Sequence, residues 1–324
     1  MKEVKIGLLG LGNVGLGTYK IFEMNREHIE KVTGVRPVIS KILVNNAGKD
    51  RGVKIPAGVL TENPDDVLTD PEISIVAEAL GGIEPAAGYM KKALENGKHV
   101  VTANKAALAA NFESLMKLAE SKGLELRYEA SVGGAIPVLA AVREQLQANE
   151  FTEVMGIVNG TTNYILTKMT EEGAEYADAL KKAQDLGFAE ADPTADVEGI
   201  DAANKLAILM GTLFEKFVDP AALPRTGITG VTKKDIEDAK AKGEVIKLIA
   251  GCKKDEKGGY TYSVEPKCLP ASHPLAGVSN EFNAIYITGN AAGEMMFYGR
   301  GAGSLPTGSA VAGDIVNILA GRYK

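Results

Sequence analysis

The sequence predicts an α/β protein in which a Rossmann-type doubly wound parallel sheet is followed by an α+β domain. Three observations support this fold class. A short apolar run at residues 4–10 leads into a glycine-rich turn and then into a helical pattern. Strand-like and helix-like segments alternate to about residue 128, which is typical of a parallel sheet. Beyond Glu129 the alternation stops, and long helical patterns mix with separate strand-like runs.

The first domain, residues 1–128, is expected to contain five strands and three helices. Short apolar runs are typical of strands buried on both faces of a parallel sheet. They lie at residues 4–10, 37–44, 73–79, 99–102 and 125–128, with helices predicted at 16–31, 85–96 and 112–121. A sheet of this kind binds its ligand at the carboxyl ends of the strands.

The second domain, residues 129–306, is expected to mix both kinds of element. Helices are predicted at 136–148 and 174–186, and strands at 154–158, 260–266 and 284–288. A last helix, about 307–319, follows a glycine-rich stretch. We expect the C-terminal segment 307–322 to pack back on the first domain.

The turn after the first strand carries Gly10, Gly12 and Gly15 in the spacing G-x-G-x-x-G, with Asn13 and Val14 between the last two. In a Rossmann-type sheet these glycines permit the tight turn, the approach of a pyrophosphate and close packing of the helix on the strand. The helix N-terminus then offers free N–H groups to the phosphates. The five residues therefore predict a dinucleotide site, and a glycine-rich turn without a ligand is the alternative.

The end of the second strand bears on the choice between NAD and NADP. An acid there would bind the adenine ribose hydroxyls of NAD. The sequence instead has Asn45 and Asn46, followed by Lys49 and Arg51. Two cations near a 2′-phosphate favour NADP, with NAD also usable, and a surface turn whose charges face water is the alternative.

Composition and charge indicate a soluble enzyme with a small-molecule substrate. The formal net charge of −6 offers no basic surface to nucleic acid. No apolar run approaches the length of a membrane span, and the N-terminus lacks a signal-peptide pattern. Cys252 and Cys268 form no CxxC pair, so neither a zinc site nor a disulfide framework is expected. These features predict a cytoplasmic location with reduced thiols.

The segment 187–205 concentrates ionisable side chains. It is turn-like up to Pro193 and helical from about Gly199. It contains Glu190, Asp192, Asp196, Glu198 and Asp201, and it ends on Lys205. Asp201 and Lys205 are four residues apart and so share a helix face. Such a group can grip a substrate ammonium and move a proton, and a solvated acidic loop with an ordinary helical salt bridge is the alternative.

Several motifs occur in an order and spacing that resemble homoserine dehydrogenase over nearly the whole chain. They are residues 10–15 (GLGNVG), 101–105 (VTANK), 128–137 (YEASVGGAIP), 159–164 (NGTTNY), 187–205 and 301–303 (GAG). The resemblance implies reversible, NAD(P)-dependent conversion of L-homoserine and L-aspartate 4-semialdehyde, a step in threonine, methionine and isoleucine biosynthesis. Another two-domain amino-acid dehydrogenase and a non-catalytic dinucleotide sensor are the alternatives.

The resemblance also implies roles for individual residues. Lys205 matches the family's general acid/base, and Lys105 matches a second lysine that is catalytic or contacts the cofactor. Glu190 and Asp201 match ligands of homoserine, and Asp196 matches a supporting acid. The remaining matches are Thr161 and Tyr164 beside the substrate, and Gly187 and Gly303 beside the cofactor. Salt-bridge partners are the alternative for the charged residues.

At residues 129–136 the resemblance implies a monovalent cation, Na⁺ or K⁺. Its ligands would be the carboxylate of Glu129 and the backbone carbonyls of Val132, Gly134 and Ile136. Hard oxygen ligands suit such an ion, and a glycine turn with internal hydrogen bonds is the alternative.

The resemblance further implies a homodimer or a dimer of dimers, joined through the substrate-binding domain at 129–306. Many family members carry a C-terminal regulatory ACT domain. The chain ends about where that domain would begin, so a catalytic core without it is expected.

Overall fold

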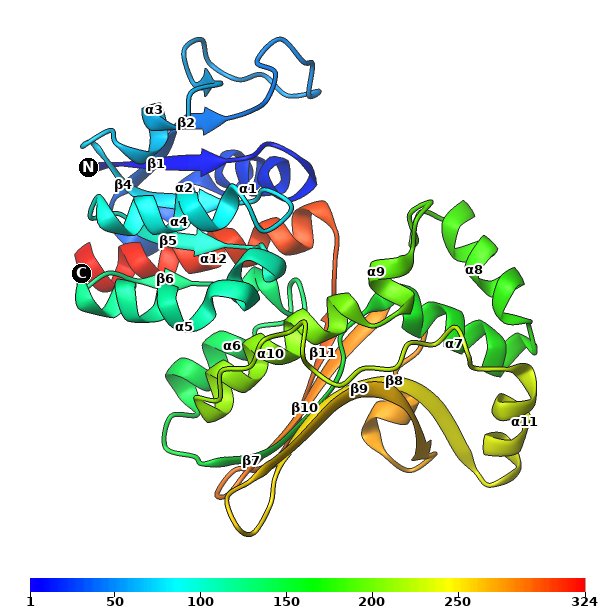
Figure 1. The fold of residues 1–324 in the computed structure, drawn as a ribbon. Helices are drawn as coiled ribbons and strands as arrows, with labels where there is room; N and C mark the ends of the chain where they lie inside the picture. Colours follow the sequence, from blue (N-terminus) through cyan, green and yellow to red (C-terminus); the bar gives the residue numbers. More distant parts are fainter. Residues whose placement is uncertain (324) are drawn as a thin grey trace. The chain divides into compact units, whose positions relative to one another are not determined.

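A parallel sheet of six strands forms the centre of the first structural unit, residues 1–135 with the segment from Ala302. The computed structural model describes residues 1–323, and within them these strands follow the order β3-β2-β1-β4-β5-β6 (Figure 1). They are β1 Glu3–Leu9, β2 Arg36–Leu43, β3 Leu60–Thr61, β4 Ile73–Glu78, β5 His99–Thr102 and β6 Leu126–Arg127. The strand order reverses at β1, as in a doubly wound Rossmann-type sheet. The predicted parallel sheet is confirmed, and β3 is an edge strand that the sequence did not reveal.

The helices of this unit correct two sequence-based expectations. They are α1 Asn13–Met24, α2 Arg26–Thr33, α3 Asp65–Leu68, α4 Ala86–Glu95, α5 Lys105–Ser121 and α12 Ser304–Tyr323, with a 3₁₀ turn, η1, at Glu129–Ser131. The helix expected at 16–31 is interrupted at Asn25, whose backbone leaves the helical region at φ −113° and ψ 19°. The helix expected at 112–121 begins earlier, at Lys105, and contains a kink at Asn111.

The C-terminal helix α12 packs along α1 within the first unit. Glycines allow the close approach, because a Cβ atom on Gly17 would overlap the backbone of Ser304 and one on Gly308 would overlap the backbone of Gly17. Ser304 Oγ also donates to the Asn13 carbonyl at 2.6 Å. The buried apolar side chains of α12 therefore share one core with those of β1 and α1.

The second unit, residues 136–301, is built on an antiparallel sheet. Within the described chain its strand order is β11-β10-β7-β8-β9 (Figure 1). The strands are β7 Phe151–Ile157, β8 Glu244–Lys254, β9 Tyr260–Pro270, β10 Phe282–Gly289 and β11 Gly293–Arg300. The helices are α6 Val138–Ala140, α7 Gly160–Glu172, α8 Tyr176–Asp185, α9 Thr194–Val197, α10 Ile200–Phe214 and α11 Lys233–Ala241, with a π-helical turn η2 Ala141–Gln145 and a 3₁₀ turn η3 Pro274–Gly277. The predicted α+β architecture is confirmed.

Several elements of the second unit differ from the sequence-based expectation. The elements α7, α11, β8 and β11 were not predicted from the sequence. The short elements α6 and η2 stand where a longer helix was expected, at 136–148. The case of α7 has a clear physical reason. From Thr161 to Leu166 every side chain of α7 is buried, including polar ones. A helix buried on all sides has no polar stripe, so its sequence lacks the periodic pattern by which helices are recognised.

The limits of the two units lie at 135/136 and 301/302. The sequence-based domain limits, 128/129 and 306/307, differ from them by several residues. One contact that holds residue 129 in the first unit joins it to the C-terminal helix: the Glu129 backbone N–H donates to Asp314 Oδ2 of α12 at 2.8 Å.

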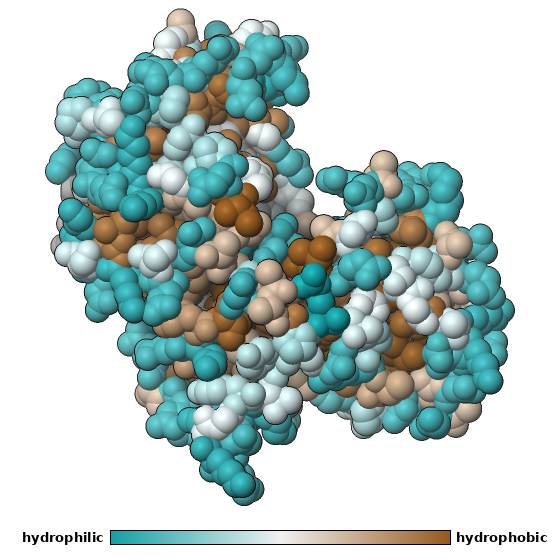
Figure 2. Space-filling model, viewed as in Figure 1, coloured by the Kyte–Doolittle hydropathy of each residue, from teal (hydrophilic) through white to brown (hydrophobic). Residues whose placement is uncertain are grey.

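The visible surface is mostly hydrophilic. Figure 2 shows polar and charged residues over much of it, with apolar residues gathered in smaller patches between them. Among the helices of residues 1–323, none combines the length and the apolar composition needed to cross a bilayer.

Candidate functional site

The glycine turn between β1 and α1 has the geometry of an anion cradle. Gly10 adopts φ +93°, and a Cβ atom there would lie 2.8 Å from the Ala79 carbonyl oxygen. A Cβ atom on Gly15 would overlap the Gly10 carbonyl oxygen. On Gly12 it would have no described atom within 4 Å, so this side of the turn is open. The first turn of α1, which begins at Asn13, has no side-chain cap among the described residues and can offer its N–H groups to phosphate.

The loop after β2 places both predicted cations on the surface. Lys49 is exposed and Arg51 is partly exposed. Arg51 Nη1 donates to the Lys49 carbonyl at 2.7 Å and Nη2 donates to the Asn46 carbonyl at 2.6 Å. The guanidinium therefore lies across its own loop and would have to turn outward to meet a phosphate with both Nη groups.

A buried carboxylate lies where β4 and β5 end. Glu78 accepts from Thr102 Oγ1 at 2.5 Å and from the Leu80 N–H at 2.7 Å. Asn104 Nδ2 approaches Glu78 at 3.4 Å, and Asn104 Oδ1 caps the first turn of α5. Burial raises the pKa of the Glu78 carboxyl. This network fixes the start of α5, whose first residue is Lys105, at the edge of the sheet where doubly wound folds bind ligands.

The second unit buries an ion pair on α10. Lys205 Nζ donates to Asp201 Oδ2 at 2.6 Å and to the Val158 carbonyl at 2.6 Å. The two side chains are only 10% and 8% exposed. The expected shared helix face is present, and burial makes this pair unlike an ordinary surface salt bridge.

Asn159 joins this pair to a second acid. Its Nδ2 donates to Asp201 Oδ2 at 2.9 Å and to Asp196 Oδ1 at 2.7 Å. Its Oδ1 accepts the Thr162 N–H at 2.9 Å and so caps α7. Sequence reasoning missed Asn159, although an asparagine between a strand and a helix is a helix-cap signal. We call Asp196, Asp201 and Lys205 the acid–lysine group.

The environment of Asp196 shifts its pKa upward. Burial raises the pKa of the Asp196 carboxyl, and the nearby charge of Asp201 acts in the same direction. The hydrogen bond from Asn159 and the charge of Lys205 act in the opposite direction. Two acids thus share one neighbourhood with a single lysine, an arrangement typical of functional sites.

The other predicted substrate residues lie at the loop that leads to these acids. Thr161 Oγ1 donates to the Phe188 carbonyl at 2.6 Å, and the rings of Tyr164 and Phe188 are 5.0 Å apart. Gly187 is exposed in this loop at φ +76°. Glu190 is exposed as well, and within residues 1–323 no hydrogen bond joins its carboxylate to the acid–lysine group.

Residues 129–134 form a buried glycine turn in the first unit. Glu129 and Val132 are 6% and 0% exposed. Gly133 and Gly134 adopt φ +75° and +58°. Across residues 1–323 no three His, Cys, Asp or Glu side chains cluster as metal ligands, a result that does not bear on a site made of backbone carbonyls.

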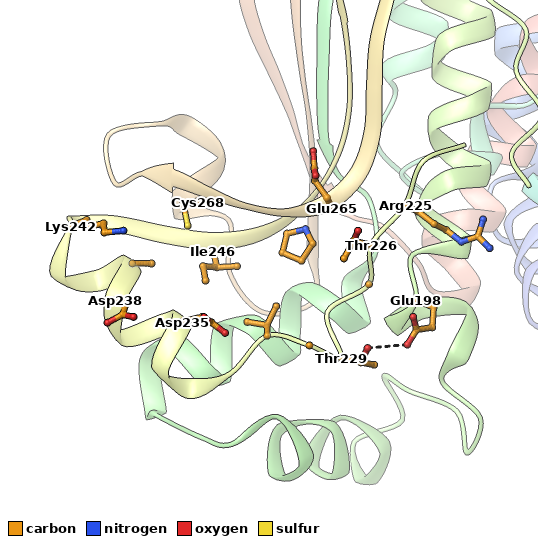
Figure 3. Close-up of a pocket in the computed structure, with 15 residues that line it drawn as sticks. Glu198, Arg225, Thr226, Thr229, Asp235, Asp238, Lys242, Ile246, Glu265 and Cys268 are labelled. Atoms are coloured by element: carbon orange, nitrogen blue, oxygen red, sulfur yellow. Dashed lines mark hydrogen bonds between the residues drawn. The ribbon is translucent and has the colours of Figure 1, made fainter. Parts of the chain in front are cut away.

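A cavity of about 840 Å³ lies elsewhere in the second unit (Figure 3). Residues 225–231, α11, β8 and β9 contribute its walls. Thr229 Oγ1 donates a hydrogen bond to Glu198 Oε1 at 3.1 Å, and Figure 3 marks this contact with a dashed line. The described residues that line it do not include the acid–lysine group. This cavity and the acid–lysine group are therefore different features of the unit.

Comparison with known families decides the relationship. The model of the homoserine dehydrogenase NAD-binding domain matches residues 10–129, and the homoserine dehydrogenase model matches residues 137–316. The chain belongs to the homoserine dehydrogenase family. The first match contains the glycine turn and Lys105, and the second contains Asn159 and the acid–lysine group.

Individual homoserine dehydrogenases support the assignment. The Bacillus subtilis enzyme is 46% identical over 319 residues, covering 98% of this chain and 73% of the relative. The Thiobacillus denitrificans structure has 42% identity and a TM-score of 0.94, over 99% of this chain and 74% of that one. A hyperthermophilic archaeal homoserine dehydrogenase in complex with NADPH has 28% identity and a TM-score of 0.81, over 97% of both chains.

These matches confirm the family resemblance drawn from the sequence motifs. They do not favour the alternative of a sensor without catalysis, because the matching relatives are named as dehydrogenases. The matches assign no role to any single residue, so these roles are inferred from the geometry.

Proposed function

We propose that this protein interconverts L-homoserine and L-aspartate 4-semialdehyde with a nicotinamide cofactor. The observation that carries the proposal is the buried Asp201–Lys205 pair, with its 2.6 Å contact, in a chain of this family. Oxidation of a primary alcohol needs a group that takes the hydroxyl proton and anions that hold the substrate ammonium. The acid–lysine group supplies both kinds of group within one hydrogen-bonded cluster.

Lys205 is proposed as the general acid/base. During oxidation its amine takes the hydroxyl proton, and during reduction its ammonium returns that proton to the forming alkoxide. A nicotinamide cofactor, when bound, would accept the hydride in oxidation and supply it in reduction. Asp201 and the Val158 carbonyl hold Nζ of Lys205 in one place, as efficient proton transfer requires.

The remaining roles follow the same proposal. Asp201 and Glu190 bind the substrate ammonium, with Glu190 brought in by its exposed loop, and Asp196 supports them. Thr161 and Tyr164 hold that loop through Phe188. In the first unit, Lys105 contacts the cofactor at the end of β5, together with Gly303.

A direct assay tests the function. Folded protein is mixed with NADP⁺ and L-homoserine in buffer containing Na⁺ or K⁺, and absorbance of the reduced nicotinamide is followed. The reverse reaction is measured with the semialdehyde and NADPH. Cofactor binding without turnover in either direction would contradict the proposal, and turnover of a different amino alcohol would favour another amino-acid dehydrogenase.

The glycine turn fits a dinucleotide, and we propose NADP as the preferred form, with NAD usable. The open space beside Gly12 and the uncapped start of α1 would receive the pyrophosphate through the backbone at Asn13 and Val14. The archaeal relative in complex with NADPH supports a nicotinamide cofactor. Lys49 and Arg51 are proposed to meet the 2′-phosphate.

Replacing both Lys49 and Arg51 by alanine is expected to raise KM for NADP⁺ roughly 5- to 30-fold, the range for about 1–2 kcal/mol of charge-assisted bonding. KM for NAD⁺ should change little, because NAD⁺ lacks the 2′-phosphate. The variant Lys31→Ala removes an exposed cation from α2 and serves as the control. Equal loss of affinity for both cofactors, or a parent enzyme that prefers NAD⁺, would show that these two cations do not bind the 2′-phosphate.

A monovalent cation, Na⁺ or K⁺, is proposed at Glu129 with the carbonyls of Val132, Gly134 and Ile136. Burial of the carboxylate and the positive φ of Gly134 support it. The ion would stabilise the turn without joining the chemistry. Melting temperature and turnover are compared in NaCl, KCl and tetramethylammonium chloride at equal ionic strength, and identical values in all three would argue against the site.

We also propose a cytoplasmic homodimer or dimer of dimers, joined through the second unit. The exposed side chains of Met296 and Tyr298 on the edge strand β11 support an interface there. Light scattering measures the assembly, and charged substitutions at both positions should shift it toward the monomer. A monomeric parent would refute this part.

A further inference from the structure

The Asn159 side chain sits where both acids and α7 meet, and it is 5% exposed. An amide carries two N–H donors on one atom and an acceptor on the other. The Thr162 N–H and hydroxyl both donate to Oδ1, at 2.9 and 3.0 Å, which fixes the orientation of the amide. Both hydrogens of Nδ2 are therefore directed at carboxylates, one at Asp196 and one at Asp201.

Two features show that the Asn159 side chain does more than cap a helix. Asp201 Oδ2 accepts from Asn159 on one side and from Lys205 on the other, so its position is fixed from two directions. The residue before Asn159 supplies the second acceptor for Lys205, the Val158 carbonyl. Two consecutive residues at the end of β7 thus hold both members of the ion pair, and a neutral donor keeps the two like charges of Asp196 and Asp201 together.

We propose that Asn159 is a positioning residue that holds Asp196 and Asp201 and thereby places the proton-carrying Nζ of Lys205. The proposal rests on the proposed function for its kinetic consequence. Asn159 itself exchanges no proton and need not touch the substrate. If Asn159 had only a structural role, its side chain would serve only to cap α7.

Substitution can separate capping from positioning, because asparagine, aspartate and serine are nearly equivalent helix caps. Only asparagine donates hydrogen bonds to both acids. In Asn159→Ser and Asn159→Asp the cap is retained, but neither side chain can donate to both acids, because serine has one O–H donor and ionised aspartate has none. Positioning predicts that kcat falls roughly 10- to 100-fold in both variants. Capping alone predicts kcat near that of the parent, which would overturn the proposal.

A matched control removes a cap at another place in the same unit. Thr232 caps α11 through a reciprocal capping box with Asp235. The variant Thr232→Ala should lower the melting temperature while leaving kcat unchanged. If it lowered kcat as strongly as Asn159→Ser, loss of a helix cap would explain both results and the positioning role would be rejected.

The second readout needs no substrate. In Asn159→Asp a third carboxylate faces Asp196 of α9 and Asp201 and Lys205 of α10, so each acid binds its proton more tightly in the folded state than in the unfolded state. The variant therefore keeps its stability at low pH and loses it as the pH rises through the raised folded-state pKa values of these acids. The melting-temperature deficit of Asn159→Asp should therefore grow from pH 5 to pH 8, whereas that of Asn159→Ser should stay nearly constant.

A double variant gives the decisive comparison. The double variant Asn159→Asp with Asp196→Asn exchanges the amide and the carboxylate between the two positions, so an amide donor again faces a carboxylate. It should recover much of the melting temperature that Asn159→Asp loses at pH 8. A deficit independent of pH, or no recovery, overturns the proposal even if a single variant folds poorly. Absence of homoserine turnover in the parent would reject the proposed function alone, because the melting experiments remain informative.

Discussion

Replacing Lys205 by alanine is expected to lower kcat for homoserine oxidation by roughly 10²–10⁴-fold, the usual contribution of general acid/base catalysis. The expectation follows from the position of Nζ, which is buried and held by two acceptors at 2.6 Å. Cofactor affinity should change little, because the cradle for the dinucleotide lies in the first unit. Steady-state kinetics and a separate cofactor titration measure the two effects.

The chain offers a matched control for this substitution. Lys181 and Asp185 have the same spacing on α8, with Nζ and Oδ1 2.5 Å apart, but their side chains are 70% and 61% exposed. The variant Lys181→Ala should keep kcat and melting temperature near those of the parent. If Lys205→Ala is folded and has nearly normal kcat, the proton passes through another group, and Lys105 becomes the first candidate.

Replacing Asp201 by alanine is expected to damage both catalysis and stability. It leaves Lys205 buried without its carboxylate, and breaking a buried pair in this way typically costs about 3–5 kcal/mol. It also removes a proposed ligand of the substrate ammonium, so KM should rise and kcat should fall as Nζ shifts. Denaturant unfolding and steady-state kinetics measure these changes.

The exposed partner Asp185 again provides the control, because loss of a surface i,i+4 pair costs only about 0.2–0.5 kcal/mol. An unchanged kcat/KM in Asp201→Ala would remove Asp201 from the site. An equal loss of stability in Asp201→Ala and Asp185→Ala would show that the buried pair contributes no more than a surface pair.

Much of the fold could be predicted because its signals are local. The strands of the parallel sheet are apolar runs, and the turn at Gly10 carries its own chemical requirement. Elements whose signal depends on their surroundings escaped prediction. The first turns of α7, residues 161–167, are buried on every side and show no exposed polar stripe. The break at Asn25 divides a helical pattern that looks continuous along the chain.

The candidate site, too, was only partly predictable from the sequence. The acids and the lysine of segment 187–205 stand out by composition, and family resemblance assigned their roles. Glu78, which ends a buried strand, and Asn159, which caps a helix, belong to the polar networks of the structure but were not singled out as functional residues. Their importance lies in contacts with residues far away in the sequence, Thr102 for Glu78 and Asp201 for Asn159.

The sequence by itself determined the parallel sheet, the glycine turn and the shared helix face of Asp201 and Lys205, because each depends on spacing within one short segment. Only the tertiary structure decided that this pair is buried and that Asn159, 37 residues before Asp196 and 42 before Asp201, bridges the two acids. The physical reason is that burial and hydrogen bonding across such separations arise from the packing of whole elements. Here the packing of α7, α9 and α10 joins a partly buried acid, Asp196, and a buried ion pair, Asp201 with Lys205, into one hydrogen-bonded group.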